Sequence, residues 1–173
     1  MRPIRLLAPL ALLGLAACGG PLLSAEVVVD RFCLVQHVTG LPPILAAGTA
    51  TTPPVSAPLQ LPPLLRTSGS TAEVELLDGK LTPTTPGVTL DGIDRLDLLL
   101  GPGLAPAAHY VRATAGPVTS IPLSGAGVDV GGMIRSGSIT MAFTVTASGP
   151  PPAVAWEADL ELCFRGKTVV SYF

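Results

Sequence analysis

The histidines and serines of this chain raise the question of hydrolytic chemistry. His37 and His109 are the only histidines. A Ser–His–Asp site would need one of them beside a nucleophile held in a strained, exposed turn. No Gly-x-Ser-x-Gly elbow occurs, and the Ser-Gly pairs at 68, 136 and 148 are typical of ordinary turns. We therefore expect both histidines on strand surfaces and predict no enzyme, with a hydrolase as the distant alternative.

The densest acidic run is a second candidate for chemistry. Asp91, Asp94 and Asp97 are spaced three apart, whereas calcium requires several oxygen ligands that converge from a loop. Residues three apart on a strand point to opposite faces. A turn could still bring Asp91 and Asp94 together, so these two are weak metal candidates. Solvated turn acids, with Arg95 as an ion-pair partner, are the more ordinary interpretation.

Cofactor motifs are not evident. The glycines of 125–131 are spaced unlike a dinucleotide loop, no helical pattern follows them, and there is no Walker motif. Trp156 could line a ligand pocket, but it is in phase with apolar neighbours along its strand, which favours a core position. We expect no cofactor.

The first 17 residues have the three regions of an export signal. Arg2 and Arg5 precede an apolar run from Leu6 to Leu15, and small residues follow. About ten apolar residues reach only ~15 Å as a helix, half of a ~30 Å bilayer core. A secretory signal is therefore expected rather than a membrane-spanning anchor.

Leu15-Ala16-Ala17-Cys18 resembles the lipobox of bacterial lipoproteins. The resemblance implies cleavage before Cys18 and fatty acylation, including palmitate, of that residue. Gly19 follows the cysteine, where Asp would imply retention at the inner membrane, so the resemblance favours the outer membrane of a Gram-negative bacterium. Cleavage by ordinary signal peptidase, with Cys18 left free, is the alternative. Two or more acyl chains would hold a domain stably.

With Cys18 acylated, Cys33 and Cys163 form an even pair in an oxidising compartment, for which a disulfide is expected. Redox thiols usually occur as Cys-x-x-Cys, and zinc sites need more cysteine or histidine nearby. Neither pattern surrounds these two residues. We predict a structural disulfide on adjacent strands, outside the main core.

The composition indicates an all-β fold. Nineteen Pro and 19 Gly interrupt helices, while 48% hydrophobic residues argue against disorder. The net charge is −2, and loss of Arg2 and Arg5 with the leader would make the mature domain more acidic. Such a surface lacks the basic stripe that nucleic-acid binding needs. Attachment to a membrane would have to come through Cys18.

Alternating apolar and polar residues predict about eight to ten short antiparallel strands in a β-sandwich, immunoglobulin-like or similar. In the first strand, Val27, Val29 and Cys33 are predicted on one face, with Val28 and Phe32 on the other. Asp78-Gly79 marks either a hairpin turn or a bulge. Residues 165–167 read as a turn. The other predicted strands cover 93–100, 108–114, 118–123, 139–146 and 154–164, and the Pro-rich stretch 41–65 reads as an edge with two strand starts or as a partner-binding segment.

The domain organisation follows from these features: a signal peptide at 1–17, a lipidated tether at 18–24 and one sandwich domain at 25–173. Residues 73–164, with Leu-Asp-Gly-Ile-Asp at 90–94 and a Pro-rich hairpin, are similar to uncharacterised bacterial β-sandwich lipoproteins, which carry no known activity. We predict a non-enzymatic envelope lipoprotein with a structural or protein-binding role. The alternative is a carrier of a small apolar ligand between the sheets.

Overall fold

The computed structural model describes residues 23–41, 43, 47–58, 73–114, 116–134, 137–148 and 154–172. The predicted leader and Cys18 lie outside these residues. The elements are β1 (Leu23–Leu41), β2 (Gly48–Thr51), β3 (Val55–Pro58), β4 (Glu73–Pro83), β5 (Ile93–Leu100), β6 (Ala105–Val111), β7 (Ile121–Gly125), α1 (Gly131–Ile134), β8 (Ser138–Ala147) and β9 (Trp156–Tyr172).

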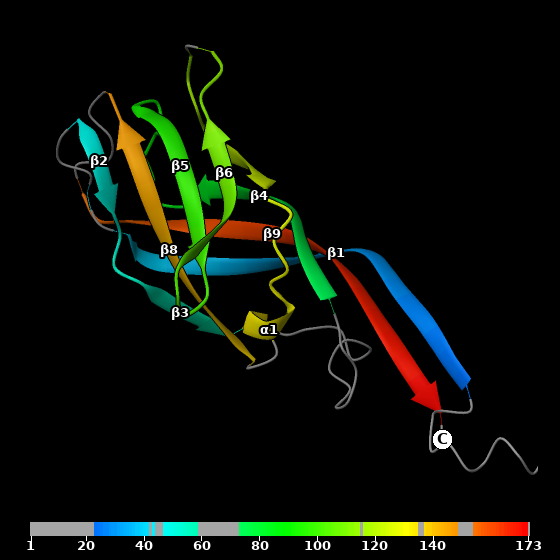
Figure 1. The fold of residues 1–173 in the computed structure, drawn as a ribbon. Coiled ribbons are helices and arrows are strands. Elements are labelled where there is room, and N and C mark those ends of the chain that lie inside the picture. Colours follow the sequence, from blue (N-terminus) through cyan, green and yellow to red (C-terminus); the bar gives the residue numbers. More distant parts are fainter. Residues whose placement is uncertain are drawn as a thin grey trace, which may run out of the picture.

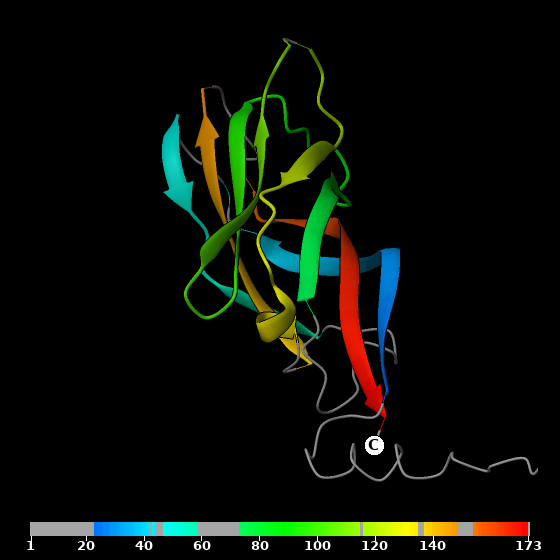
Figure 2. The ribbon, with the colours of Figure 1, turned by 45° about the vertical axis from the view of Figure 1, so that its right-hand side comes forward.

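In the described part of the chain, antiparallel pairing joins all nine strands into one sheet. Its order is β1-β9-β4-β7-β6-β5-β8-β2, and β3 also pairs with β8. The sheet folds over on itself: β5, β6 and β8 form one layer, and β1 and β9 cross behind them steeply (Figures 1 and 2). This confirms the predicted all-β, antiparallel, sandwich-like fold. The two layers belong to one continuous sheet, whereas an immunoglobulin sandwich has two separate sheets.

The core lies between the two layers and is made by alternate residues of the strands. In β9, Trp156, Leu160 and Phe164 are buried, while the residues between them that carry charge face outward. The Phe164 ring stacks on that of Phe32, with 5.5 Å between centroids. The predicted core position of Trp156 is confirmed, since it is 4% exposed.

A bulge in β1 changes which residues face the core. The pairing of β1 with β9 shifts register between Val29 and Phe32. Val29 and Phe32 therefore both pack against the core, while Val28 is exposed. The predicted faces are correct for the residues that follow the bulge and wrong for those that precede it. The reason is that an extra residue in one strand reverses the alternation.

The predicted turn at 165–167 is wrong, because β9 continues through it. Gly166 lies opposite Val29 of β1 on one side and Val74 of β4 on the other. Two neighbouring ladders hold its backbone extended, which overrides the turn preference of a Gly flanked by charged residues.

The Asp78-Gly79 signal proves to belong to one strand with a bulge, the second of the two predicted alternatives. Pairing of β4 with β9 shifts between Leu76 and Asp78. At this place β7 passes very close to β4: a Cβ built on Gly125 would lie 2.0 Å from the carbonyl oxygen of Leu76. Only glycine permits that approach. The Pro-rich stretch supplies the two short strands β2 and β3 at the edge of β8, and the rest of it lies outside the described residues.

The ends of β1 and β9 leave the body together as a two-stranded arm (Figures 1 and 2). We define the arm as Leu23–Val29 of β1 with 166–172 of β9, which pair from Val29–Gly166 to Leu23–Tyr172. Pairing of β9 with β4 ends at Lys167. Beyond that residue, β1 is the only described strand that pairs with β9.

Candidate functional site

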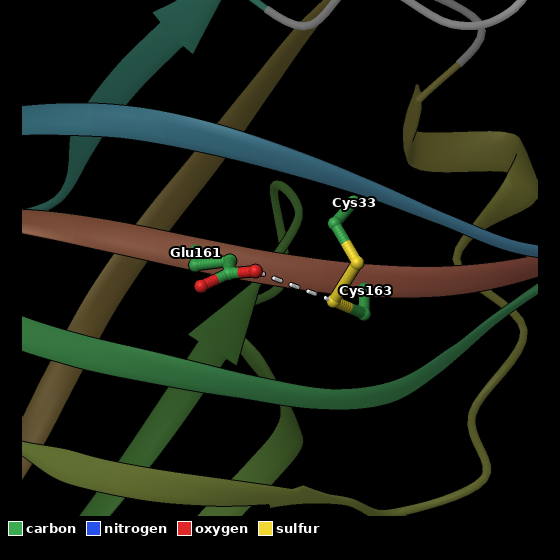
Figure 3. Close-up of side chains that lie close together, drawn as sticks. All are labelled: Cys33, Glu161 and Cys163. Atoms are coloured by element: carbon green, nitrogen blue, oxygen red, sulfur yellow. Dashed lines mark hydrogen bonds between the residues drawn. A yellow bond between two sulfur atoms is a disulfide. The ribbon is translucent and has the colours of Figure 1, made fainter.

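The disulfide is the one site for which sequence and structure agree in detail. Cys33 and Cys163 are directly opposite in the β1–β9 ladder and are joined by a disulfide bond, with 4.0 Å between their Cα atoms. Figure 3 shows the bond crossing from one strand to the other. It lies on the outer face of the sheet, so the predicted bond between adjacent strands outside the main core is confirmed.

Glu161 gives this site the composition of a metal centre. Its carboxylate lies 3.9 Å from Cys163 Sγ (Figure 3), and Cys33, Glu161 and Cys163 form the one group of three potential ligands within the described residues. A bonded sulfur has no proton to donate and is not a thiolate, the form that binds metals. In the oxidised protein this group is therefore a covalent link beside a carboxylate.

Charged side chains cover the outer face around the disulfide. Arg31 donates two hydrogen bonds of 2.9 Å to Asp78 across β9, and Arg165 pairs with Glu75. These groups are about half exposed, so each ion pair contributes little to stability.

His37 is held between two carboxylates on the same face. Its Nδ1 lies 2.8 Å from Asp159 Oδ1, and its Nε2 lies 3.4 Å from Glu157 Oε2. The hydrogen bond to Asp159 is the main cause that raises the pKa of His37 above its ordinary value. Both ring nitrogens therefore face acids, and neither makes a hydrogen bond to a hydroxyl group of the described residues.

His109 lies in a cross-strand row whose composition suggests catalysis. It pairs with Asp97 of β5 on one side and with Ser124 of β7 on the other. Arg95, however, donates two hydrogen bonds to Asp97, at 2.8 and 3.0 Å. No hydrogen bond joins His109 to Ser124 or Asp97, so the row lacks the linked nucleophile, base and orienting acid of a hydrolase. Both histidines lie on exposed strand faces, as the sequence predicts.

The two weak metal candidates have different surroundings. Asp91 accepts a hydrogen bond from the backbone N–H of Val118, which ties the β6–β7 loop to the turn before β5. Asp94 is the second residue of β5 and lines a hollow beside Arg112. Among the described residues, no group of three potential metal ligands includes either aspartate. This role of Asp91 in holding the loop could not be predicted from sequence, because its hydrogen-bond partner is a backbone group 27 residues away.

The interior between the layers contains little free space at the place where a carrier would hold its ligand. A cavity of about 10 Å³ lies among Leu81, Phe143 and Trp156. A single water molecule needs roughly that volume, so this cavity does not accommodate an apolar ligand. Among the described residues, no helix has the length and apolar character needed to cross a bilayer.

Comparisons with known proteins do not assign the chain to a family. No family model matches it, and no curated protein matches it. Among solved structures it is similar to a chain of the "Cyanophage Pam1 capsid asymmetric unit", with 18% identity over 95% of this chain and 93% of that chain. The TM-score of that match is 0.27, so the similarity carries no argument about fold or function.

Proposed function

We propose that this chain is a lipid-anchored, non-enzymatic domain of the bacterial cell envelope, tethered through acylated Cys18 and serving a structural or protein-binding role. The direction of the arm is the observation that carries the proposal. Leu23 lies at the arm's far end, outside the body. Four residues separate Cys18 from Leu23, so the two lie within about 18 Å of each other whatever path the chain takes.

The arm suits an anchored domain because it adds a spacer between anchor and body. Leu23–Val29 pairs with β9 along its length, and seven residues of a strand extend about 20 Å. A domain anchored at Cys18 would therefore be held about one arm's length from the bilayer. Acyl chains contribute roughly 0.8 kcal/mol for each buried methylene, so the acidic surface need not bind lipid.

The surroundings of the two histidines support the non-enzymatic part of the proposal. His37 is paired with Asp159, and His109 is not hydrogen-bonded to its neighbour Ser124. The carrier alternative gains no support from the small cavity beneath Trp156.

Mass spectrometry of the mature protein, expressed in a Gram-negative host, tests the anchor. The expected product begins at Cys18 and carries a diacylglyceryl group and an amide-linked acyl chain, and it fractionates with the outer membrane. The C18S variant should accumulate as uncleaved precursor, while the matched C33S/C163S variant should still be lipidated. A mature wild-type product with unmodified Cys18, free in the periplasm, would overturn the proposal.

Crosslinking of intact cells followed by purification tests the binding role. A protein-binding function predicts a reproducible crosslinked partner from the envelope. A purely structural function predicts none, and activity towards ester or glycoside substrates that is lost in the H37A/H109A variant would contradict the non-enzymatic assignment.

A further inference from the structure

Figure 1 shows that β6 ends on the side of the molecule opposite the arm. A hollow of about 540 Å³ is lined there by residues of β6, of β7 and of the segment between them. It forms because these neighbouring strands share only two register pairs, Ala108–Gly125 and His109–Ser124. Two positions further along the same register, Val111 would lie opposite Pro122, which has no N–H to donate. The two strands therefore part where the sequence has a proline.

Each strand is then held by its other neighbour. The backbone N–H of Arg112, just after β6, donates to Asp94 O at 2.7 Å, while Ile121 of β7 pairs with Leu81 of β4. The separation is thus fixed on both sides by ladders of the main sheet.

Hydrogen bonds also hold the described residues of the segment between β6 and β7. The guanidinium of Arg112 donates to the carbonyl oxygens of Thr114 and Gly116, at 3.1 and 2.6 Å. Val118 donates its N–H to the Asp91 carboxylate and accepts a hydrogen bond from Leu90 N at 3.1 Å. Charge-assisted bonds of this kind are among the stronger ones in proteins, so the hollow is formed before any ligand arrives.

The lining is neutral, whereas ion pairs lie on the outer face around the disulfide. None of the residues that line the hollow is an acid, a lysine or an arginine. The lining residues that have hydrogen-bonding side chains and do not pack against the core are His109, Thr114, Thr119, Ser120 and Ser124. The apolar lining residues outside the core are Val111, Ala113, Pro117 and Pro122.

We propose that this hollow is a binding site for a neutral carbohydrate chain. Hydroxyl and imidazole groups, which both donate and accept, match the hydroxyl rim of a sugar ring, and the valine and proline surfaces match its C–H faces. The lining has no charged side chain that would favour phosphate or a charged peptide. The volume lies within the roughly 300–1,000 Å³ usual for ligand sites. Only the direction in which the hollow faces, away from the membrane and towards envelope glycans, rests on the proposed function.

NMR titration of the full chain in a sugar-free zwitterionic detergent tests the site, with chitotetraose and maltotetraose as the neutral probes. At least one probe should shift the amide signals of residues 109–111 and 119–124 in a saturable way, with a Kd of about 1 mM. S124A should weaken binding about five- to tenfold through loss of one hydrogen bond, and S120W should abolish it by filling the hollow. The matched variant S56A, on the exposed face of β3, should bind like the wild type.

Lack of saturable shifts with both sugars would overturn the site, as would binding unaffected by S120W. The titration does not depend on lipidation. Failure of the sugar site and failure of the membrane anchor are therefore separate results.

Discussion

The strands β1 and β9 pair with each other in two different environments. Comparing the two separates the contribution of ladder pairing to stability from the contribution of packing. In the body, Phe32–Leu41 lies opposite Trp156–Phe164, β4 flanks β9 on its other side, and the core lies beneath. In the arm, the same two strands pair without β4 beyond Lys167. Both segments are rich in residues that favour strands.

A favourable sequence and a continuous ladder are not expected by themselves to make the arm a stable element. A two-stranded ribbon is marginal in water, whereas a third strand and a buried apolar face give independent stability. The arm also contains Thr168, which is 1% exposed and whose Oγ1 lacks a hydrogen bond among the described residues. We therefore expect the body half of this strand pair to be the stable half.

Truncation of Phe164 should produce the largest effect. Phe164 is fully buried and stacks on Phe32, so F164A should lower the free energy of unfolding by about 3–5 kcal/mol through lost burial and the cavity left behind. The control on the same strand is V169A in the arm, at a residue that is 38% exposed, which should change stability by less than about 0.5 kcal/mol. Urea denaturation followed by circular dichroism measures both. Equal costs would refute the contrast between body and arm.

Loss of the disulfide should have the next largest effect. The bond joins residues 130 positions apart, so removing it in C33S/C163S frees a long loop in the unfolded chain and should cost about 2–4 kcal/mol. Reduction of the wild type with dithiothreitol should give a similar loss in the same assay. If neither treatment lowers the unfolding midpoint, the ladder and core already hold the two strands and the bond is redundant.

How much of this could be predicted from sequence depends on whether the deciding interactions are local. Alternation in Trp156–Phe164 predicted the buried face of β9 because that signal lies within one strand. The pairing of Cys33 with Cys163 followed from the cysteine count and from the oxidising compartment that the sequence predicts. Those features need no knowledge of neighbouring strands.

The errors arose where a neighbour decides the structure. The bulge after Val29 and the continuation of β9 through Gly166 depend on register with β9 and with β4, which local pattern does not encode. Predicting the hollow beside Pro122 would also have required the strand order. Pro122 lacks an N–H, but only the sheet order shows that the pairing interrupted there is the one with β6.

Hydrogen exchange compares the stability of the arm and body segments within the same strands. Amides of the arm at 25–29 and 168–170 should exchange at least about 100-fold faster than amides of β1 at 33–38, because local opening of a two-stranded ribbon needs less free energy than opening of the core. NMR-detected exchange on the full chain measures both sets. Equal protection would mean that the arm is stabilised by further packing.

Thr168 offers a way to strengthen the arm. T168V keeps the shape of the side chain and removes the buried hydroxyl, so the variant should be more stable by about 1 kcal/mol. The gain should appear mainly as slower exchange of the arm amides. T168S keeps the hydroxyl and is the control. A loss of stability in T168V would indicate that the hydroxyl has a partner.

The smallest predicted effect depends on pH and lies at the body end of the same strand pair. The Asp159 hydrogen bond raises the pKa of His37 in the folded chain above its ordinary value of 6.5. Stabilisation by protonated His37 should therefore be fully present below pH 6.5 and lost as pH rises through the folded pKa. The difference in urea midpoint between wild type and H37Q should be larger at pH 5.5 than at pH 8.5, and D159N should remove most of that dependence. If the difference is the same at both pH values, the ion pair across β1 and β9 contributes nothing measurable, and burial with the disulfide accounts for the stability of the body end.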